Sequence, residues 1–447
     1  MPTIRRRTDS FKSETTVICC RDKNDYDATK PEKQDAAADH PKKSASISLD
    51  MDAKLPQKVP SEREKSLAVP VADFSRQYSR IAPEIHEAIE RVCASQHFIL
   101  GDEVAQFETE AAAYCGTSYA IGCASGTDAL WLCLATVGIG PGDAVLTTPF
   151  SFFATVSSIL RCGATPVLAD IDPYTFNLDP AAAQEVLQSS QHSEMRAILP
   201  VHLFGQCADW DAFRALRREH DCLLIEDAAQ AFGATWQGKP AGCLGGLGAF
   251  SFYPTKNLGA YGDAGMVTTD SLPLTEHLRI LRAHGMRERY VHEEVGWNSR
   301  LDAMQAAILR VKLRYIEEWN QQRRAHAATY DELFQKSGLA ETGPYPHRGV
   351  VLPRTDPRGT HVFHQYVIRT AKRDELRAFL TEHNIGSEIY YPTPLHLQPG
   401  LSFLGYQKGD FPESERASRE VLALPMFPEL TQEEQERVVS TIAEFLS

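Results

Sequence analysis

GAFSFYPTKNLGAYGDAGMVTT, residues 248–269, places one lysine, Lys256, between two short apolar segments that predict strands. Phe250 and Phe252 make the approach to the lysine apolar, and Gly259 and Gly262 after it allow close backbone approach. A lysine held out of water has a lowered pKa and becomes an amine nucleophile. Most lysines, however, are solvated surface groups, and this stretch alone does not exclude that reading of Lys256.

Upstream, the segment CLLIEDAAQAFGA at residues 222–234 begins with four apolar residues, which are followed by Glu226 and Asp227. The pattern predicts a buried strand with Asp227 at its carboxyl end, which is the edge where open α/β sheets bind ligands. A carboxylate there needs a cationic or hydrogen-bonding partner, and a protonated pyridine nitrogen is one such partner. A structural aspartate that pairs with an arginine or caps a turn is the alternative.

Two further segments follow predicted strands. ASGTDAL, residues 124–130, begins a helix, where free N–H groups and the helix dipole favour an anion; an ordinary helix cap supplied by Thr127 is the alternative. TTPFSFFATVSS, residues 147–158, offers aromatic side chains that would lie flat on a cofactor ring or, alternatively, fill the core.

The 447 residues allow two or three domains at about 100–200 residues each. The formal net charge of -13 argues against a nucleic-acid binder, which normally presents a basic face. None of the ten cysteines has C-x-x-C or zinc-ligand spacing, so buried thiols in a reducing compartment are expected and a metal site is not. No apolar run is long enough to span a membrane, no apolar signal core follows the basic N-terminus, and a cytoplasmic location is therefore expected.

The chain divides into three predicted regions. Residues 1–67 are rich in Lys, Asp, Ser and Pro and predict disorder, either as a docking tail or as a dispensable extension. Residues 68–290 begin with two helices and then alternate apolar strands with helices, which predicts an α/β fold with a mostly parallel sheet covered on both faces. Residues 291–447 predict a long linking helix, starting near DAMQAAIL, and a small α+β domain that contains the strand HVFHQYVIRT.

Together these segments resemble the sugar aminotransferases of the DegT/DnrJ/EryC1/StrS family, from VPVADFSRQY at residue 69 to ALPMFPELT near residue 431. The motifs that carry the resemblance are, in chain order, FILGDEVAQFETEAAAYCG, ASGTDAL, TTPFSFFAT, PVHLFGQCAD, IEDAAQAFGA, FSFYPTKNLGAYGDAGMV, GWNSRLDAMQAAIL and GDFPESERASREVLALPMFP. The resemblance implies a fold type I enzyme that depends on pyridoxal 5′-phosphate (PLP) and works as a homodimer.

The resemblance also implies residue roles around the PLP ring. Lys256 forms a Schiff base with the cofactor and later moves a proton between substrate and cofactor. Asp227 pairs with the pyridinium nitrogen, Gln230 bonds the phenolic oxygen, and Phe152 stacks on the ring.

Other residues are implied to bind the cofactor phosphate. Gly126, Thr127 and Ser251 contact the phosphate of the same subunit, and Asn298 reaches the phosphate of the other subunit's cofactor. Under this resemblance the two active sites of the dimer are shared.

The implied reaction moves an amino group from L-glutamate to a nucleotide-linked keto-sugar, for polysaccharide or amino-sugar biosynthesis. The tail EIYYPTPLHLQPG is similar to members that act on 3-keto or 4-keto sugars, including the 3-oxo-glucuronate type. It suggests Tyr390, Tyr391 and His396 as substrate contacts, and Arg287 in HGMRERY as a partner for a phosphate or carboxylate.

Two alternatives remain at this point. Instead of a transaminase, the chain could be a catalytically idle relative with a regulatory role, or an enzyme with another PLP reaction such as sugar dehydration. A subgroup of this fold that dehydrates sugars has histidine in place of the Schiff-base lysine. Lys256 therefore favours transamination.

Overall fold

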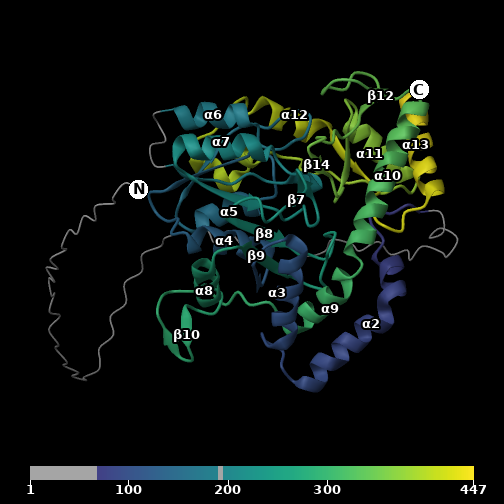
Figure 1. Ribbon diagram of the computed structural model, residues 1–447. Helices are drawn as coiled ribbons and strands as arrows, with labels where there is room; N and C mark the ends of the chain where they lie inside the picture. Colours follow the sequence, from purple (N-terminus) through teal and green to yellow (C-terminus); the bar gives the residue numbers. More distant parts are fainter. Residues whose placement is uncertain (1–67, 190–194) are drawn as a thin grey trace, which may run out of the picture. The chain divides into compact units, whose positions relative to one another are not determined.

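The computed structural model describes residues 68–189 and 195–447 (Figure 1). By their contacts these residues belong to one compact unit, Pro60–Ser447. The predicted disorder of residues 1–67 lies outside the described residues. The boundary predicted between residues 290 and 291 stays a prediction.

A seven-stranded sheet of order β1-β9-β8-β5-β4-β2-β3 forms the centre of the fold. Its strands are β1 (Tyr119–Cys123), β2 (Ala144–Thr147), β3 (Thr165–Leu168), β4 (Met195–Ile198), β5 (Leu223–Asp227), β8 (Leu247–Ser251) and β9 (Gly265–Thr269). Only β9 runs antiparallel, against β1 on one side and β8 on the other. The remaining six strands therefore end at the same edge of the sheet.

Successive residues of these strands enter different cores. Leu224 of β5 and Met266 of β9 belong to one buried cluster, whereas their neighbours Ile225 and Val267 belong to another. Side chains alternate across a strand, so both faces of the sheet are buried.

Helices supply the cover for both faces (Figure 1). The first cluster includes side chains of α2 (Phe74–Ser95), α3 (Asp102–Cys115), α6 (Pro180–Gln188), α7 (Trp210–His220) and α9 (Ala303–Leu313). The second includes side chains of α4 (Gly126–Thr136), α5 (Ala154–Arg161) and α8 (Leu272–Leu281). The predicted α/β fold, with a mostly parallel sheet covered on both faces, is confirmed.

A second, smaller sheet of order β12-β13-β15-β16 lies in the C-terminal part. Its strands are β12 (Ala340–Glu341), β13 (Val350–Val351), β15 (Tyr366–Arg369) and β16 (Val421–Leu424). Helices α10 (Ile316–Lys336) and α11 (Arg373–Glu382) contact its strands, and α13 (Gln432–Leu446) packs against both helices. Val69 joins its core and bridges to Ile385, so the start of the described chain packs on this C-terminal part.

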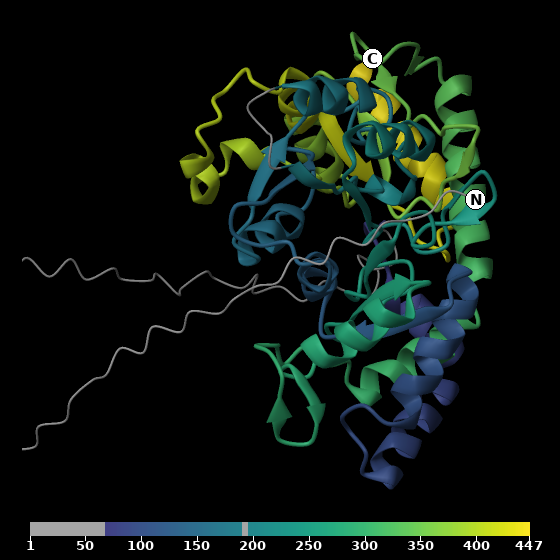
Figure 2. The same ribbon diagram turned by 60° about the vertical axis from the view of Figure 1, so that its left-hand side comes forward.

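The remaining elements are short. They are the ribbon β14 (Gly359–Thr360), β6 (Thr235–Trp236) and β7 (Lys239–Pro240), the hairpin β10 (Met286–Glu288) with β11 (Val291–His292), the helix α12 (Pro412–Glu420), and the 3-10 turns Leu203–Gly205, Leu395–Leu397 and Pro399–Leu404. In both views the β10–β11 hairpin extends away from the rest of the described chain (Figures 1 and 2).

Two predicted elements differ from the structure. The long linking helix is two helices, because the chain turns at Arg314 and Tyr315, where both side chains bond to Glu84. The predicted strand HVFHQYVIRT is a strand only from Tyr366, and residues 361–365 form a loop instead.

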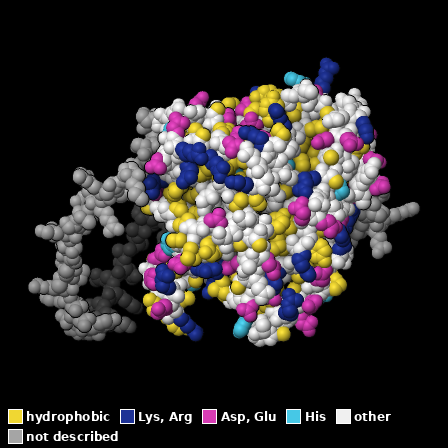
Figure 3. Space-filling model, in the orientation of Figure 1, with side chains coloured by type: hydrophobic (Ala, Val, Ile, Leu, Met, Phe, Trp, Pro, Cys, Tyr) yellow, Lys and Arg dark blue, Asp and Glu magenta, His cyan; other side chains and the backbone are white. Residues whose placement is uncertain are grey.

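The surface seen in Figure 3 carries acidic and basic side chains interspersed. Among the described residues, no helix combines the length and the apolar character that a membrane span requires.

Candidate active site

Four segments that follow parallel strands meet at one edge of the sheet. Ser125 follows β1, Ser151 follows β2, and Asp227 and Ser251 end β5 and β8. Because these strands point the same way, their ends bring together residues that lie far apart in the sequence.

Lys256 lies in the turn that leaves β8. Its N–H donates to the carbonyl of Tyr253 at 2.8 Å, which holds the turn closed under the side chain. Burial lowers the pKa of Lys256 to about 8, while the negative charge of Asp227 acts in the opposite direction. The amine is therefore far easier to deprotonate than that of a surface lysine.

Asp227 is only 3% exposed at the end of β5. Thr155 donates its hydroxyl to Oδ2 at 2.8 Å, and the N–H of Ala229 donates to Oδ1 at 3.3 Å. Burial raises the pKa of Asp227, and these two donors and the charge of Lys256 offset only part of that rise. A cation within reach of this carboxylate would complete its pairing.

Glu226, next to Asp227, has a different role. Its carboxylate is fully buried and accepts from the N–H groups of Gly242, Leu244 and Gly245 at 2.6–2.8 Å. His202 Nε2 lies 3.2 Å away, and the His202 Nδ1 accepts from a backbone N–H, so Nε2 carries the proton. Glu226 thus ties the loop before β8 to β5.

The N-terminus of α4 approaches Ser251 very closely. A Cβ on Gly126 would lie 2.5 Å from the Cβ of Ser251, so only glycine permits this contact. The cap is Ser125, whose hydroxyl accepts from the N–H of Asp128 at 3.1 Å, and not Thr127. The first N–H groups of a helix have no acceptor within the helix, so this corner is suited to an anion.

Gln230 is held from two sides. Its Oε1 accepts from the N–H of Phe204 at 2.7 Å, and its Nε2 donates to the hydroxyl of Tyr391 at 3.0 Å. The ring of Tyr391 lies 6.3 Å from that of Phe152, which is 58% exposed. Burial raises the pKa of Tyr391, so its hydroxyl keeps its proton at neutral pH.

These groups line one cavity of about 760 Å³. Nine residues that the sequence suggested line it, namely Gly126, Thr127, Phe152, Asp227, Gln230, Ser251, Lys256, Tyr390 and Tyr391. Lys256 is the only lysine or arginine among the lining residues, whereas Asp227, Asp263 and Glu388 contribute carboxylates. The cavity wall of one chain is therefore short of positive charge.

His364 lines the same cavity and was not suggested by the sequence. Asn257 donates its amide to Asn320 at 2.7 Å and to the Val362 carbonyl at 3.1 Å, so its Oδ1 faces His364 Nδ1 at 3.2 Å. His364 Nδ1 must then be the donor. Burial lowers the pKa of His364 well below its ordinary value, and the ring is neutral.

Three suggested residues do not line this cavity. Asn298 and Arg287 are exposed at the base and on the first strand of the β10–β11 hairpin, and Arg287 pairs with Glu293 at 2.9 Å. His396 is 2% exposed, with Nε2 3.1 Å from Glu415. The His396 side chain links the Leu395–Leu397 turn to α12, and its role as a substrate contact stays a prediction.

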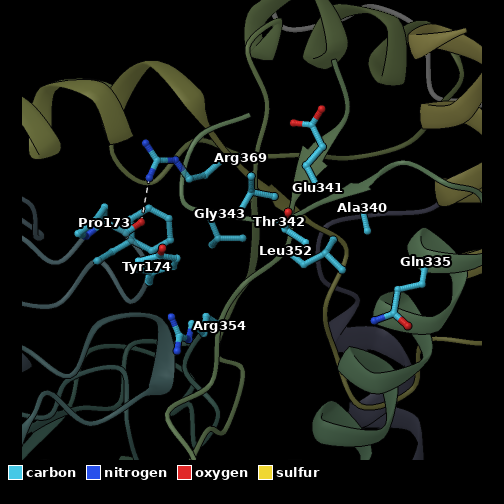
Figure 4. A pocket seen from close by; sticks show the side chains of 13 residues that line it. Pro173, Tyr174, Gln335, Ala340, Glu341, Thr342, Gly343, Leu352, Arg354 and Arg369 are labelled. Atoms are coloured by element: carbon cyan, nitrogen blue, oxygen red, sulfur yellow. Dashed lines mark hydrogen bonds between the residues drawn. The ribbon is translucent and has the colours of Figure 1, made fainter. Parts of the chain in front are cut away.

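A second cavity, of about 410 Å³, lies between residues 173–176 and the small sheet (Figure 4). Its Arg369 donates to the Pro173 carbonyl at 2.9 Å and pairs with Glu420 at 2.6 Å. Its Glu341 carboxylate accepts three backbone N–H groups at 2.6–2.9 Å. These charges already stabilise the fold, so the cavity around Lys256 is the better candidate.

Comparisons with known proteins agree on one family. A model of the DegT/DnrJ/EryC1/StrS aminotransferase family matches residues 79–443. A Geobacillus stearothermophilus protein named pleiotropic regulatory protein is 50% identical over 377 residues, 84% of this chain and 98% of that protein. A Streptomyces venezuelae dTDP-3-amino-3,4,6-trideoxy-alpha-D-glucose transaminase is 41% identical over 385 residues, 86% of this chain and 98% of that enzyme.

Solved structures give the same result. Streptomyces venezuelae DesV in complex with a ketimine intermediate superposes with a TM-score of 0.80 at 41% identity, over 85% of this chain and 99% of that one. Bacillus subtilis NtdA with bound cofactor PMP superposes with a TM-score of 0.75 at 28% identity, over 88% and 90%.

Proposed function

The chain belongs to the DegT/DnrJ/EryC1/StrS aminotransferase family, and we propose that it moves the amino group of L-glutamate to a nucleotide-linked keto-sugar. It is a PLP-dependent transaminase with relatives that make amino sugars. The observation that carries the proposal is that Lys256, with its lowered pKa, and the buried Asp227 line the same cavity.

The residues present fit PLP. The buried Asp227 carboxylate has two hydrogen-bond donors and a raised pKa, and a pyridinium N–H is the kind of cation that would stabilise its charge. The corner formed by Gly126, Thr127 and Ser251 has no room for another Cβ and suits a phosphate. The exposed ring of Phe152 would cover one face of the cofactor.

When bound, PLP supplies an electron sink for the charge left on a substrate carbon that loses a proton. Lys256 Nζ is the group that would hold the cofactor and then carry that proton. With a pKa of about 8, about one amine in ten is unprotonated at pH 7, against about one in three thousand for an ordinary lysine. Asp227 would hold the ring nitrogen of the bound cofactor in its protonated form, which is the form that withdraws electrons best.

Lysine at position 256 also favours transamination over dehydration. A primary amine is both the covalent partner and the proton carrier, and histidine, which replaces it in the dehydrating subgroup, cannot form that covalent bond. The relatives named as transaminases agree with this choice.

The active sites of a homodimer would be shared. All the proposed ligands are anions, yet within residues 68–189 and 195–447 Lys256 is the only lysine or arginine that lines the cavity. The β10–β11 hairpin carries Arg287 and Arg289, its tip residue Tyr290 is 77% exposed, and Asn298 lies at its base. We infer that the hairpin of a second copy brings Asn298 and the guanidinium group of Arg289 to this cavity.

The sugar would lie against Tyr390, Tyr391 and Glu388, which line the cavity. Tyr391 keeps a proton that it can donate to an oxygen, and Glu388, bonded to Arg377 at 3.0 Å, can accept from sugar hydroxyls. Both the choice between 3-keto and 4-keto sugars and a cytoplasmic location remain predictions.

An amino-transfer assay tests the proposal. The PLP-loaded protein is incubated with ¹⁵N-glutamate and a panel of UDP- and dTDP-linked 3-keto and 4-keto hexoses, and the sugars are analysed by mass and NMR. We expect ¹⁵N on one class of sugar and 2-oxoglutarate in equal amount. A protein that takes up PLP but labels no sugar would instead favour the regulatory role that the name of the Geobacillus relative suggests.

A further inference from the structure

One face of α9 contacts the turn that follows Lys256. Gln305 and Lys312 are seven residues apart in this helix, which is two turns, so they lie on the same side. Both side chains bond to backbone groups of residues 259–261. Neither residue lines the cavity, and neither has a role in the proposed reaction.

Lys312 is a buried lysine with a single strong backbone contact. It is 2% exposed, its Nζ donates to the Gly259 carbonyl at 2.5 Å, and it lies 5.1 Å from the centre of the Tyr261 ring. Burial lowers the pKa of Lys312 to about 8. Burying an ammonium group is costly, so a lysine at this position indicates that the contact with Gly259 is important.

Gln305 holds the backbone of Tyr261, two residues after Gly259. Its Oε1 accepts from the Tyr261 N–H at 2.8 Å, and its Nε2 donates to the Tyr261 carbonyl at 3.3 Å. A Cβ on Gly262 would lie 3.1 Å from that amide nitrogen, so the backbone passes close to Gln305. The two side chains therefore fix the segment at two points.

A shift of this segment would reach Lys256. A Cβ on Gly259 would lie 2.3 Å from the Pro254 carbonyl oxygen, so the two ends of the turn are in contact. The N–H of Ala260 donates to the Phe252 carbonyl at 2.8 Å, which closes the same turn at its base. Lys256 lies inside it, and a displaced Gly259 would displace Pro254 and Lys256 as well.

We propose that Lys312 and Gln305 are positioning residues that hold the turn of Lys256 in place through Gly259 and Tyr261. Only the expected effect of these two residues on the rate of amino transfer rests on the proposed function. The hold on the turn is a property of the chain itself and can be measured without cofactor or substrate.

The test measures the rate of acetylation of Lys256 as a function of pH in the full-length, cofactor-free protein. The modified peptide is quantified by mass spectrometry. In the wild type we expect a titration near the pKa of about 8. Lys312→Met should release the turn, expose Lys256 to water and raise its apparent pKa by about one unit. Lys312→Arg keeps a hydrogen-bond donor, so the apparent pKa of Lys256 should stay close to its wild-type value. Lys336→Met, at a lysine 73% exposed on α10, should leave that pKa unchanged.

An unchanged titration of Lys256 in folded Lys312→Met overturns the proposal. If that variant does not fold, Gln305→Ala decides, because it removes only the contacts with Tyr261: a smaller rise in the apparent pKa supports the proposal and no rise overturns it. In the PLP-loaded enzyme we expect kcat to fall about 10- to 100-fold with the KM for glutamate nearly unchanged. A wild type that binds no PLP would contradict the proposed function and leave the acetylation result valid.

Discussion

At the scale of single residues, burial and charge act on Lys256 in opposite directions. Removal from water favours the free amine and the Asp227 carboxylate favours the ammonium, and the outcome is a pKa of about 8. Burial raises the pKa of Asp227, which favours its neutral form in the same way that burial favours the neutral amine of Lys256. A free amine near neutral pH suits Lys256 as a proton carrier, whereas the buried Asp227 needs a cationic partner to keep its negative charge.

Lys256→Ala should abolish amino transfer. The variant lacks both the covalent partner and the proton carrier, so we expect a loss of more than about a thousandfold in kcat and no visible absorption band from PLP bound to the protein. Stopped assays and spectra of the reconstituted variant measure both. Lys336→Ala, which removes an exposed lysine from α10, is the matched control and should behave as the wild type. Substantial turnover by Lys256→Ala would show that another group carries the proton.

Asp227→Asn keeps the shape of the side chain and removes its charge. The Thr155 hydroxyl can still donate to the amide oxygen, so the fold should survive. We expect kcat to fall about 100- to 1000-fold, because a neutral amide does not keep the ring nitrogen protonated. Steady-state kinetics and a thermal melt separate this effect from unfolding, and an unchanged kcat would remove Asp227 from the mechanism.

The sequence was informative about Lys256 and Asp227 because Asp227 ends an apolar strand and Lys256 lies in the turn after another, so a local pattern predicts their places. Thr155 and His364 were missed, since their partners Asp227 and Asn257 lie 72 and 107 residues away in the chain. The tail motif suggested His396 as a substrate contact, but its burial against Glu415 depends on packing between the Leu395–Leu397 turn and α12. Long-range contacts of this kind leave no local signal.

At the scale of elements, the end of β8 and the start of α4 form the proposed phosphate corner. The approach depends on Gly126 facing Ser251 and on Gly265, whose Cβ would lie 2.2 Å from the Ser125 carbonyl oxygen. The end of β8, the start of α4 and the start of β9 must therefore stay in contact for the N-terminus of α4 to face the cavity.

Gly126→Ala should weaken PLP binding. The new methyl group has to push α4 away from Ser251, which we expect to cost about 1–3 kcal/mol of stability and to lower PLP affinity at least about tenfold. Gly140→Ala is the matched control, because its Cβ would have no atom nearer than 3.9 Å. Equal PLP affinity in both variants, measured by absorbance titration, would contradict the phosphate corner.

Periodicity predicted the seven strands of the central sheet and most of its helices, but not where elements end. The long linking helix has no proline or glycine at Arg314 and Tyr315, and it breaks because α9 packs with α2 and α3 while α10 packs with α13. The apolar residues of HVFHQYVIRT suggested one strand, yet residues 361–365 form a loop, and His364 and Gln365 of this loop line the cavity.

At the scale of the whole molecule, a shared active site predicts complementation between two damaged subunits. Lys256→Ala and Asn298→Ala chains, unfolded together and refolded, should form mixed dimers in which one of the two sites has intact Lys256 and intact Asn298. With random pairing we expect about a quarter of wild-type activity, well above that of either parent. Activity equal to the average of the parents would contradict sharing.

Buried thiols predict that stability falls as the pH rises above about 8.5. Burial raises the pKa of seven cysteines above the ordinary value of 9.0, so the unfolded chain loses these protons first and unfolding is favoured. The lowered pKa of Lys256 and of Lys312 acts in the opposite sense, but two amines are outnumbered by seven thiols. The seven are Cys115, Cys123, Cys133, Cys162, Cys207, Cys222 and Cys243.

Urea unfolding of the cofactor-free protein between pH 7 and pH 10 measures this slope. Cys133→Ala removes one fully buried thiol and should make the fall in the free energy of unfolding less steep. Cys93→Ala, at an exposed thiol, should leave the slope unchanged. Identical slopes in all three proteins would show that the thiols do not control the alkaline loss of stability.

The most direct test of the account is to locate the cofactor on the chain. The full-length protein is loaded with PLP, reduced with borohydride, digested, and its peptides are analysed by mass. We predict a single pyridoxyl label on Lys256, and none on Lys312, which is buried and also has a lowered pKa. A label on any other lysine, or no label at all, would contradict the assignment of Lys256 as the residue that holds PLP.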